Sequence, residues 1–568
     1  DRQPERIVTR LTRRDGDIEA DWVLLSLDPR LDSQSGFWFS VYASGAVADG
    51  VYSGDTEMDA SWDSVWEAKT ARDEGGWVAE YRIPYHALRF GPRAEYVWGL
   101  NVERHISRKQ ERAQWSLISR GQTGLVSRFG RLEGLRGFSP PLHLEAVPYA
   151  LGRVEADHGE DWYGSVGADL RYGTSSGTSL NVTINPDFGQ VEADPATLNL
   201  TAYEEFYGER RPFFLEGAAT FTNANYYVFH SRRIGRRPGG LPLPDGTREL
   251  SRPMATTILG AVKLTGKTAG RTSFGLLDAV TAREYARVEP DTGGARRQVL
   301  VEPLANYLVG RATQDLRDGT SMVGAMATAV SRQEGSPAYA GLLDWDLRYL
   351  QDRYQVTGAL IGTRTGGLGD REHGYIAHLE LDKRGGWLEA ETGLAAISPH
   401  ADLNDVGYLR RNDQVSSWAY LIAYRHDPWG PLQRLDFSPG WDVACNWDGM
   451  VLANGVSAAL SGDTRSNWWL HLDGGRNLRR MDDDDVRRGG PVIRRPAENW
   501  VHFQIDTDDR RPFSFTLRPE VKRHDGGASH ERRLTLAAAW RPRPSLWFSV
   551  APVYVHGVAD AQWVQTDP

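Results

Sequence analysis

Residues 513–522 read FSFTLRPEVK, and apolar side chains alternate with polar ones along nearly the whole stretch. Successive side chains of a β-strand point to opposite faces, so a period of two predicts a strand with one apolar and one polar face. The same alternation recurs at intervals after residue 142. It is clearest in residues 165–172, 178–184, 375–382, 418–425, 468–473 and 534–540.

Turn signals separate these predicted strands. Asp-Gly pairs, which favour tight hairpin turns, stand at residues 245–246, 318–319, 448–449 and 525–526. They divide the region 142–568 into roughly twenty strands of about 10–14 residues, with charged side chains in the middle of the polar faces. An outer-membrane-type β-barrel, with lipid outside and a wet or plugged lumen inside, accounts for this pattern. Soluble β-sandwich or propeller modules are the alternative, although the chain shows no repeat of about 40–50 residues.

Aromatic residues support the barrel interpretation. Tryptophan (20) and tyrosine (22) are both more frequent than phenylalanine (17), a balance typical of sugar-binding faces and of membrane interfaces. Several tryptophans lie near the ends of predicted strands, where they would form a girdle at the membrane surface. These are Trp387, Trp418, Trp468, Trp500 and Trp547.

The first 137 residues follow a different pattern. Their predicted strands, such as 22–27, 37–42 and 77–83, are shorter, carry bulkier apolar residues and are separated by turns rich in Asp, Gly and Ser. These features predict a compact β-sandwich. Gly-Phe-Ser-Pro-Pro at residues 137–141 interrupts every pattern. We therefore expect an all-β protein with a sandwich over residues 1–137 and a large antiparallel transmembrane barrel over 142–568.

Composition excludes several classes of protein. The 568 residues carry a formal net charge of −9, which argues against nucleic-acid binding because that needs a net basic face. A single cysteine, Cys445, excludes a disulfide scaffold and a cysteine-based zinc site. No run of about 18 apolar residues is present, so the sequence predicts no transmembrane helix.

Two motifs resemble known families. WDSVWEAK at residues 62–69, followed by GWVAEYRIP at 76–84, resembles the carbohydrate-binding-family-9-like module. NPDFGQVEADP at 185–195, continued by ERRPFFLEG at 209–217, is similar to the hallmark of the DUF5916 family. The residues of this second motif that we assign a structural role are Asn185, Pro186, Asp187, Phe188, Gly189, Glu209, Arg210, Arg211, Pro212, Phe213, Phe214 and Glu216.

The resemblance covers essentially the whole chain. It implies a periplasmic family-9-like module joined to an outer-membrane barrel in Gram-negative bacteria. Family members usually carry a further strand or two before the position of Asp1 and continue well past Pro568. The resemblance therefore also implies that both domains lack terminal strands in this chain. The family has no firmly assigned activity, so architecture and location are implied more directly than chemistry.

Candidate ligand-binding residues lie in the N-terminal domain. Sugar binding needs a flat aromatic surface flanked by groups that hold hydroxyls. Trp62, which stands beside Asp63 near a turn, is the first candidate for that surface, and Trp38 is the second. Loop carboxylates also suit Ca²⁺, although their spacing here fits no EF-hand. The candidate calcium ligands are Asp28, Asp32, Asp59 and Asp63. Core tryptophans and solvated turn aspartates are the alternatives, and the sequence implies no other cofactor.

The motif at 185–217 breaks the alternation and is too long for a hairpin turn. In a barrel it fits an insertion inside the lumen or at the periplasmic rim, and a surface loop is the alternative. Unpaired charges are costly away from water. We therefore expect Glu209, Arg210, Arg211 and Glu216 to anchor the insertion by pairing with strand side chains that face the lumen.

Signals for catalysis are few. Glu204 and Glu205 are adjacent, so on a strand they would face opposite sides, whereas glycoside hydrolysis needs two carboxylates in one cleft. No Gly-x-Ser-x-Gly, His-Glu-x-x-His or P-loop motif is present. The charge run MDDDDVRR at 481–488 is typical of a solvated loop, with a divalent-cation or lipopolysaccharide contact as the alternative.

The sequence thus predicts a non-catalytic outer-membrane barrel with a periplasmic glycan-binding-type domain. Its expected role is to handle or pass a glycan or another envelope substrate. The alternatives are a secreted or surface glycan-active hydrolase and a structural component of a cell-envelope assembly. Expected partners are outer-membrane lipid and lipopolysaccharide, a glycan ligand and envelope proteins, but not nucleic acid.

Overall fold

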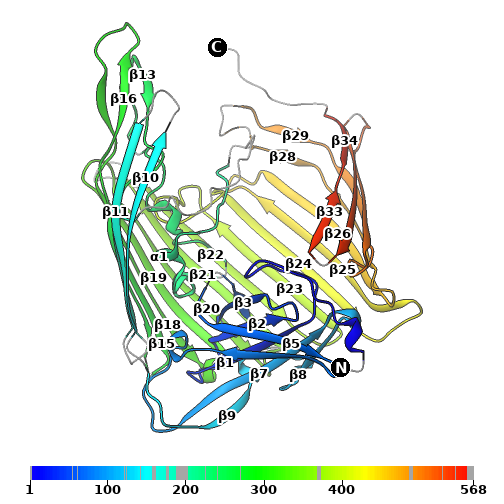
Figure 1. Cartoon of the computed structure of the whole chain (residues 1–568). Helices are drawn as coiled ribbons and strands as arrows, with labels where there is room; N and C mark the ends of the chain where they lie inside the picture. The colour runs from blue at the N-terminus through cyan, green and yellow to red at the C-terminus, as the bar shows by residue number, and fades with distance from the viewer. Residues whose placement is uncertain are drawn as a thin grey trace.

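The computed structural model describes residues 3–559 apart from 54, 61, 120, 121, 123, 141, 142, 156–160, 174–177, 187–202, 224, 240, 269, 367–371, 485, 487–489, 528 and 544. Strands dominate, and they form an N-terminal domain and a much larger sheet (Figure 1). The prediction of an all-β fold, with a sandwich followed by a large antiparallel sheet, is confirmed. None of the described helices is long and apolar enough to cross a membrane.

The N-terminal domain consists of short strands joined by turns and single-turn helices. The strands are β1 (Trp22–Asp28), β2 (Gly36–Tyr42), β3 (Val47–Ser53), β4 (Glu57–Asp59), β5 (Glu67–Asp73), β6 (Gly76–Arg82), β7 (Tyr96–Ile106), β8 (Glu111–Gln114) and β9 (Gly130–Leu135). The helices are η1 (Pro4–Arg6), η2 (Tyr85–Ala87), η3 (Ser107–Lys109) and η4 (Val126–Arg128).

Two layers of strands make this domain a sandwich. A seven-stranded sheet runs in the order β4-β3-β2-β1-β7-β8, with β9 also paired to β7, and the hairpin β5–β6 covers one of its faces. Phe39, Trp66 and Tyr81 form the core between the layers, with the rings of Trp66 and Tyr81 stacked. Alternation places Trp38 and Tyr52 on the opposite face of the sheet, where they form a second core.

In the described part of the chain, twenty strands form the large sheet, and neighbours pair antiparallel. They are β10 (His143–Glu155), β11 (Asp161–Gly173), β12 (Ser179–Ile184), β14 (Ile258–Lys267), β15 (Thr272–Thr281), β18 (Ala305–Leu316), β19 (Ser321–Arg332), β20 (Ala338–Tyr349), β21 (Tyr354–Thr365), β22 (Glu372–Lys383), β23 (Leu388–Ile397), β24 (Gln414–Arg425), β25 (Leu432–Cys445), β26 (Val451–Thr464), β27 (Trp469–Asn477), β30 (Glu498–Asp506), β31 (Phe513–His524), β32 (His530–Arg543), β33 (Leu546–Val550) and β34 (Val553–Val558).

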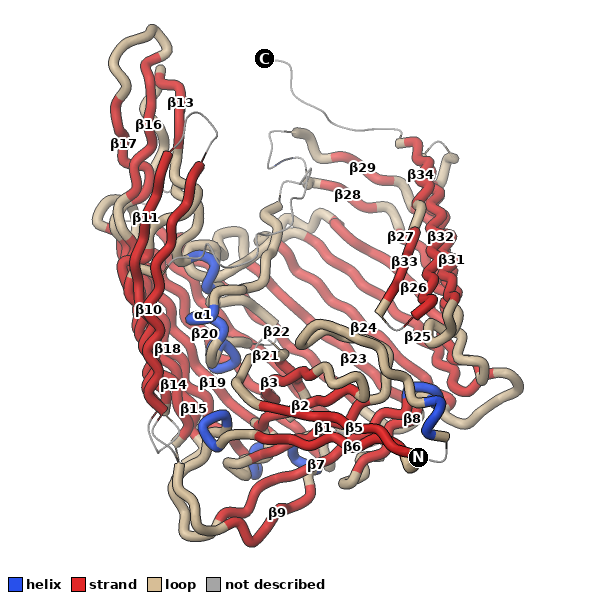
Figure 2. The backbone as a smooth tube through the Cα atoms, viewed as in Figure 1, coloured by secondary structure: helices blue, strands red, loops and turns tan. Residues whose placement is uncertain are grey.

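The large sheet curls around the N-terminal domain, which lies on its concave side near one end (Figures 1 and 2). Within the described residues, β10 and β34 do not pair with each other, so the sheet is curved but open. At the far end a small sheet made of β13 (Thr247–Ser251), β16 (Glu284–Pro290) and β17 (Arg297–Glu302) extends beyond the other strands. The pair β28 (Arg480–Asp482) and β29 (Ile493–Arg495) forms another small sheet, and η7 (Arg317–Gly319) joins β18 to β19.

The two faces of the large sheet differ in polarity. Large aliphatic side chains such as Leu308, Leu343 and Leu360 point away from the concave side and are 42–58% exposed. On the concave side, polar side chains such as Arg311 and Asp344 are almost fully buried. This division follows directly from the period-two alternation of each strand.

One part of the concave face is apolar, which the alternation did not predict. The connection between β12 and β14 contains α1 (Pro212–Leu215), η5 (Ala218–Phe221) and η6 (Ser231–Arg233) and packs against the sheet there. Phe214 and Ile234 of this connection contact a cluster that includes Val309 and Leu342. The connection thus occupies the upper interior, and the N-terminal domain occupies the lower interior (Figure 1).

Candidate functional site

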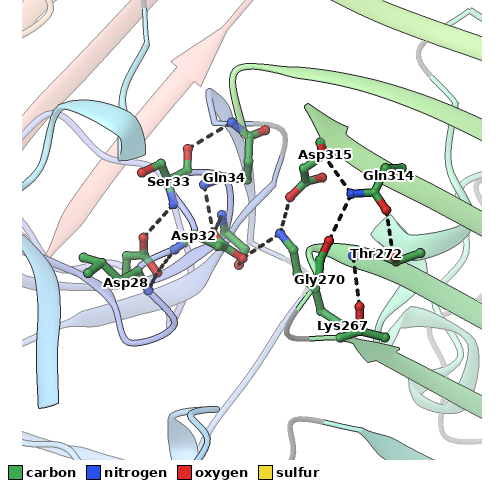
Figure 3. Close-up of polar contacts among 12 residues, drawn as sticks. Asp28, Asp32, Ser33, Gln34, Lys267, Gly270, Thr272, Gln314 and Asp315 are labelled. Carbon is green, nitrogen blue, oxygen red and sulfur yellow. Dashed lines mark hydrogen bonds and ion pairs between the residues drawn. The ribbon is translucent and has the colours of Figure 1, made fainter. Parts of the chain in front are cut away.

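Charged contacts join the N-terminal domain to the concave side of the large sheet. Lys267, at the end of β14, lies between Asp32 of the N-terminal domain and Asp315 of β18, with distances of 2.8 and 2.7 Å (Figure 3). All three side chains are about nine-tenths buried. Arg348 of β20 lies 3.5 Å from Asp55 of the N-terminal domain. The domain is therefore held at the sheet interior by charge pairs shielded from water.

The loop that carries Asp32 is shaped by its own carboxylates. Asp28 accepts backbone N–H groups of residues 30–33, and Asp32 accepts the backbone N–H and the hydroxyl of Ser35. Burial and the neighbouring charge of Asp32 raise the pKa of Asp28. Burial also acts to raise the pKa of Asp32, but Lys267 and the hydrogen bonds from Ser35 together outweigh it and lower that pKa. The structure thus places these two predicted calcium ligands against N–H groups and an ammonium.

Glu216 connects the second motif to both domains. Its carboxylate, only 10% exposed, lies 2.6 Å from Arg89 of the N-terminal domain and 2.5 Å from Arg171 of β11. Asn181 of β12 donates to the same carboxylate at 2.7 Å. Lys263 of β14 donates to the backbone carbonyl of Glu216. Glu216 thus contacts side chains of the large sheet as well as the N-terminal domain.

Arg211 and Glu209 behave differently, because they pair with each other rather than with a strand. The Arg211 guanidinium donates to both Glu209 oxygens at 2.8 and 2.6 Å and to the carbonyls of Ser231 and Ile234 at 2.6 Å. Burial raises the pKa of Glu209, but Arg211 and Ser231 outweigh it and hold the pKa at about 2. Glu209 and Arg211 are only two residues apart, so the planar guanidinium reaches both carboxylate oxygens of its neighbour in sequence.

The remaining motif residues have separate positions. Asn185 donates to the carbonyl of Val166 at 2.8 Å and to the hydroxyl of Ser165 at 3.0 Å, which fixes the end of β12 against β11. Pro186 follows it. Arg210 donates its backbone N–H to Glu209. Pro212, Phe213 and Phe214 lie in α1, and both phenylalanines are buried. Asp187, Phe188 and Gly189 lie outside the described residues.

A polar cavity of about 690 Å³ separates the N-terminal domain from the concave face of the sheet. The side chains that line it include six positive and six negative ones, together with hydroxyl and amide groups. At its wall Arg311 and Asp344 form a bidentate pair at 3.0 and 2.7 Å, and Asn223 donates to Asp344 at 2.7 Å. The charged lining residues are Arg30, Glu57, Arg89, Lys267, Arg311, Asp315, Asp344, Asp346, Arg348, Glu380, Arg384 and Glu391.

The predicted sugar-binding residues are separated by the fold. Trp62 and Asp59 line a small pocket of about 130 Å³ where the N-terminal domain meets Gly217. Trp38 is 6% exposed inside the second core, so its ring offers no open face to solvent. The carboxylate of Asp63 lies 2.7 Å from Arg14 and is not part of the lining of this pocket.

Two further expectations are modified by the structure. The acidic run that was expected to be solvated contacts neighbouring basic groups, because Asp482 pairs with Arg495 at 2.9 Å and Asp483 with Arg411 at 2.5 Å. Of the tryptophans expected in a girdle, the prediction is wrong for Trp500, which shares the polar face of β30 with His502, and for Trp418. The indole N–H of Trp418 donates to Glu391 at 2.8 Å on the cavity side.

Acidification is expected to destabilise the packed connection that contains His230 and Glu209. Burial and the nearby charge of Arg233 lower the pKa of His230 to about 4 from an ordinary 6.5. The unfolded chain therefore takes up a proton between pH 6.5 and 4 that the folded chain does not, and stability falls over this range. For Glu209 the same sign applies between pH 4.5 and about 2.

The measurement is the temperature at which the folded, fast-migrating gel band disappears, taken at pH values from about 7 to 4. In His230→Gln the fall of this temperature with pH should be smaller than in the wild type. His400→Gln is the matched control, because that imidazole is 63% exposed. A pH profile that is unchanged in His230→Gln would contradict the assignment.

Comparison with known proteins gives a strong match to a family model and weak similarity to solved structures. A family model described as "Domain of unknown function (DUF5916)" matches residues 140–567. Among solved structures, the translocation pore of the P pilus usher PapC is similar at a TM-score of 0.22 and 9% identity, covering 95% of this chain and 99% of that chain. No curated protein matches. The family-9-like module stays a prediction. Because the family model covers most of its length, the chain belongs to the DUF5916 family.

Proposed function

We propose that this chain is a non-catalytic β-barrel protein of the Gram-negative outer membrane, and that its N-terminal domain controls passage of a polar, uncharged substrate such as a glycan. The observation that carries the proposal is the docking of the N-terminal domain on the concave side of the sheet by Lys267, Arg348 and their carboxylate partners. A domain held in this way closes part of the interior, and its release opens it.

The outer face of the sheet supports a location in a membrane. Exposed leucines cover its middle, and exposed aromatic side chains cluster at the strand ends nearest the N-terminal domain. Aromatic residues at this level are typical of barrel girdles, which contact lipid headgroups and lipopolysaccharide. The aromatic residues are Tyr349, Trp387, Trp429, Trp468 and Trp547.

Loop lengths support a periplasmic position for the N-terminal domain. At the end of the sheet where this domain docks, four-residue turns at 317–320, 350–353 and 384–387 join the strands. At the other end the connections are longer, for example 398–413, and the small sheet of β13, β16 and β17 extends there. Outer-membrane barrels have short periplasmic turns and long extracellular loops.

The lining of the cavity supports a neutral, polyhydroxylated substrate. Its equal numbers of cations and carboxylates provide no net charge to select an anion or a cation. Charged side chains that are fixed in pairs nevertheless offer strong hydrogen-bond donors and acceptors for hydroxyl groups. The position of Trp62 beside Arg89 and Asp59 at the adjoining pocket adds an aromatic surface to these groups.

Weakening the docked state is expected to speed passage. In the full-length double variant Asp32→Asn/Asp55→Asn, two charge-assisted contacts are lost, each worth about 1.5–3 kcal/mol. The population of undocked domain should rise at least about tenfold for each contact. Folding should persist, because Lys267 keeps Asp315 and the asparagine oxygens still accept the local N–H groups.

The assay is swelling of liposomes that contain the purified protein, with neutral oligosaccharides of increasing size as osmolytes. The double variant should swell faster than the wild type. Glu67→Gln is the control, because Glu67 and Arg82 form an exposed pair within the same domain. Equal rates in a folded double variant would show that the N-terminal domain does not control passage.

A further inference from the structure

Two histidines and an aspartate meet on the polar face of strands β27 and β30. His471 Nε2 lies 3.0 Å from Asp473 Oδ1, and His502 Nδ1 lies 2.6 Å from the same oxygen. The three ligand atoms lie within 4.8 Å of one another, and each side chain keeps about 20% of its surface exposed. The cross-strand register places Asp473 directly opposite His502.

The surroundings fix the rings in a usable orientation. The hydroxyl of Ser461, opposite His471 on β26, lies 2.8 Å from His471 Nδ1 and leaves Nε2 directed toward Asp473. Trp469 stacks on the His471 ring at 5.0 Å, with an interplanar angle of 9°. Trp469 also lines a cavity of about 850 Å³ at the N-terminal domain, so the ring that stacks on His471 borders this cavity.

From this geometry we propose that His471, Asp473 and His502 bind a divalent transition-metal ion such as Zn²⁺, with at least one coordination position open to the interior. Two imidazole nitrogens and one carboxylate oxygen suit zinc and its neighbours in the first transition row. Ligands about 2.1 Å from a metal stand about 3.0–3.4 Å apart, so the 3.0 Å contact of His471 already has this spacing, and His502 must move away from Asp473 by at least about 0.4 Å to admit the ion. This site is independent of the proposed control of passage.

Two other interpretations use the same residues. Ser461, His471 and Asp473 have the order of a hydrolytic triad, but a triad uses one imidazole, whereas here one carboxylate oxygen faces two. A purely structural network would join the same atoms by hydrogen bonds. In a metal site, by contrast, the Ser461 contact is the outer hydrogen bond that commonly orients a ligating histidine.

The test is equilibrium dialysis of the full-length, untagged protein in detergent against Zn²⁺. The wild type should bind one Zn²⁺ per chain at this site. His502→Gln and Asp473→Asn should weaken binding by more than about 100-fold, and Ser461→Ala by about 10–100-fold. Heat-modified gel mobility shows whether each variant is folded.

His524→Gln is the matched control. His524 pairs with Glu498 at 2.8 Å on neighbouring strands, so it tests the loss of one half-buried imidazole that is outside the three-residue group. Binding that is retained in this control and lost in the other variants supports the site. Zinc uptake that is absent in the wild type, or equally strong in folded His502→Gln, would overturn it, as would ester hydrolysis that depends on Ser461 without zinc.

Discussion

Replacing Asp344 with asparagine should lower the free energy of unfolding by about 3–5 kcal/mol. The Arg311 and Asp344 side chains are only 2% and 1% exposed, and their two short contacts cross the interior face from β18 to β20. Asparagine keeps the size of the side chain but leaves the guanidinium buried without a counter-charge. It also removes the carboxylate that Asn223 contacts, so the connection between β12 and β14 loses a charge-assisted hydrogen bond to the large sheet.

The effect is measured as the midpoint of urea unfolding in detergent, followed by heat-modified gel mobility. Glu289→Gln is the control, since Glu289 pairs with Arg248 at 3.0 Å and the Arg248 side chain is 70% exposed. An exposed pair contributes only about 0–1 kcal/mol. Equal, small changes in both variants would mean that water reaches Arg311 and that the cavity wall is hydrated.

The second large effect is expected in Arg211→Ala, again about 3–5 kcal/mol. The substitution leaves the Glu209 carboxylate buried with a negative charge and frees the carbonyls of Ser231 and Ile234. It also removes the guanidinium that stacks 4.2 Å from the Phe214 ring. Arg211→Lys should recover little of the loss, because a single ammonium cannot reach four acceptors in this planar arrangement.

This change is measured as the temperature at which half of the protein has lost the fast-migrating, folded gel band. Arg232→Ala is the control, because Arg232 is a half-buried neighbour that donates to the carbonyl of Gly208. If Arg211→Ala and Arg232→Ala shift the midpoint equally, the connection between β12 and β14 is a solvated segment and does not fill the interior of the sheet.

Local pattern was enough to predict the strands. The alternation in residues 513–522 lies within β31, and roughly twenty strands were expected where the large sheet contains twenty among the residues that the structure describes. The turn dipeptides also have a physical basis, since Gly449 and Gly526 adopt φ values of 81° and 90°, which favour glycine. The alternation of side chains and the residues of a turn depend only on neighbours in sequence, so a single sequence is sufficient to predict both.

The interior could not be predicted in the same way. Lys267 and Asp32 are 235 residues apart, and nothing near either residue indicates its partner. Arg211 and Glu209, by contrast, are two residues apart, and only the preference for a local partner over a strand was missed. His471 and Asp473 share a face by spacing alone, but His502 joins them only through the strand register. Contacts set by register and docking need the three-dimensional structure.

The central claim is that the large sheet crosses the outer membrane with its apolar face in lipid and its polar face toward an interior that holds the N-terminal domain. Spin labels on β31 test it most directly. Single cysteines are introduced at each position from 513 to 518 in a Cys445→Ser background, and the protein is reconstituted in liposomes. Phe513, Phe515 and Leu517 are exposed outward at 57%, 56% and 37%.

Labels at these three positions should be relaxed by oxygen, which concentrates in lipid, and be protected from a water-soluble nickel chelate. Labels at Ser514 and Thr516 should show the opposite preference, because their side chains lie on the polar face. The account therefore predicts a period of two in the ratio of the two relaxation rates. Equal access of the nickel chelate to all positions would contradict it and identify the sheet as a water-exposed assembly.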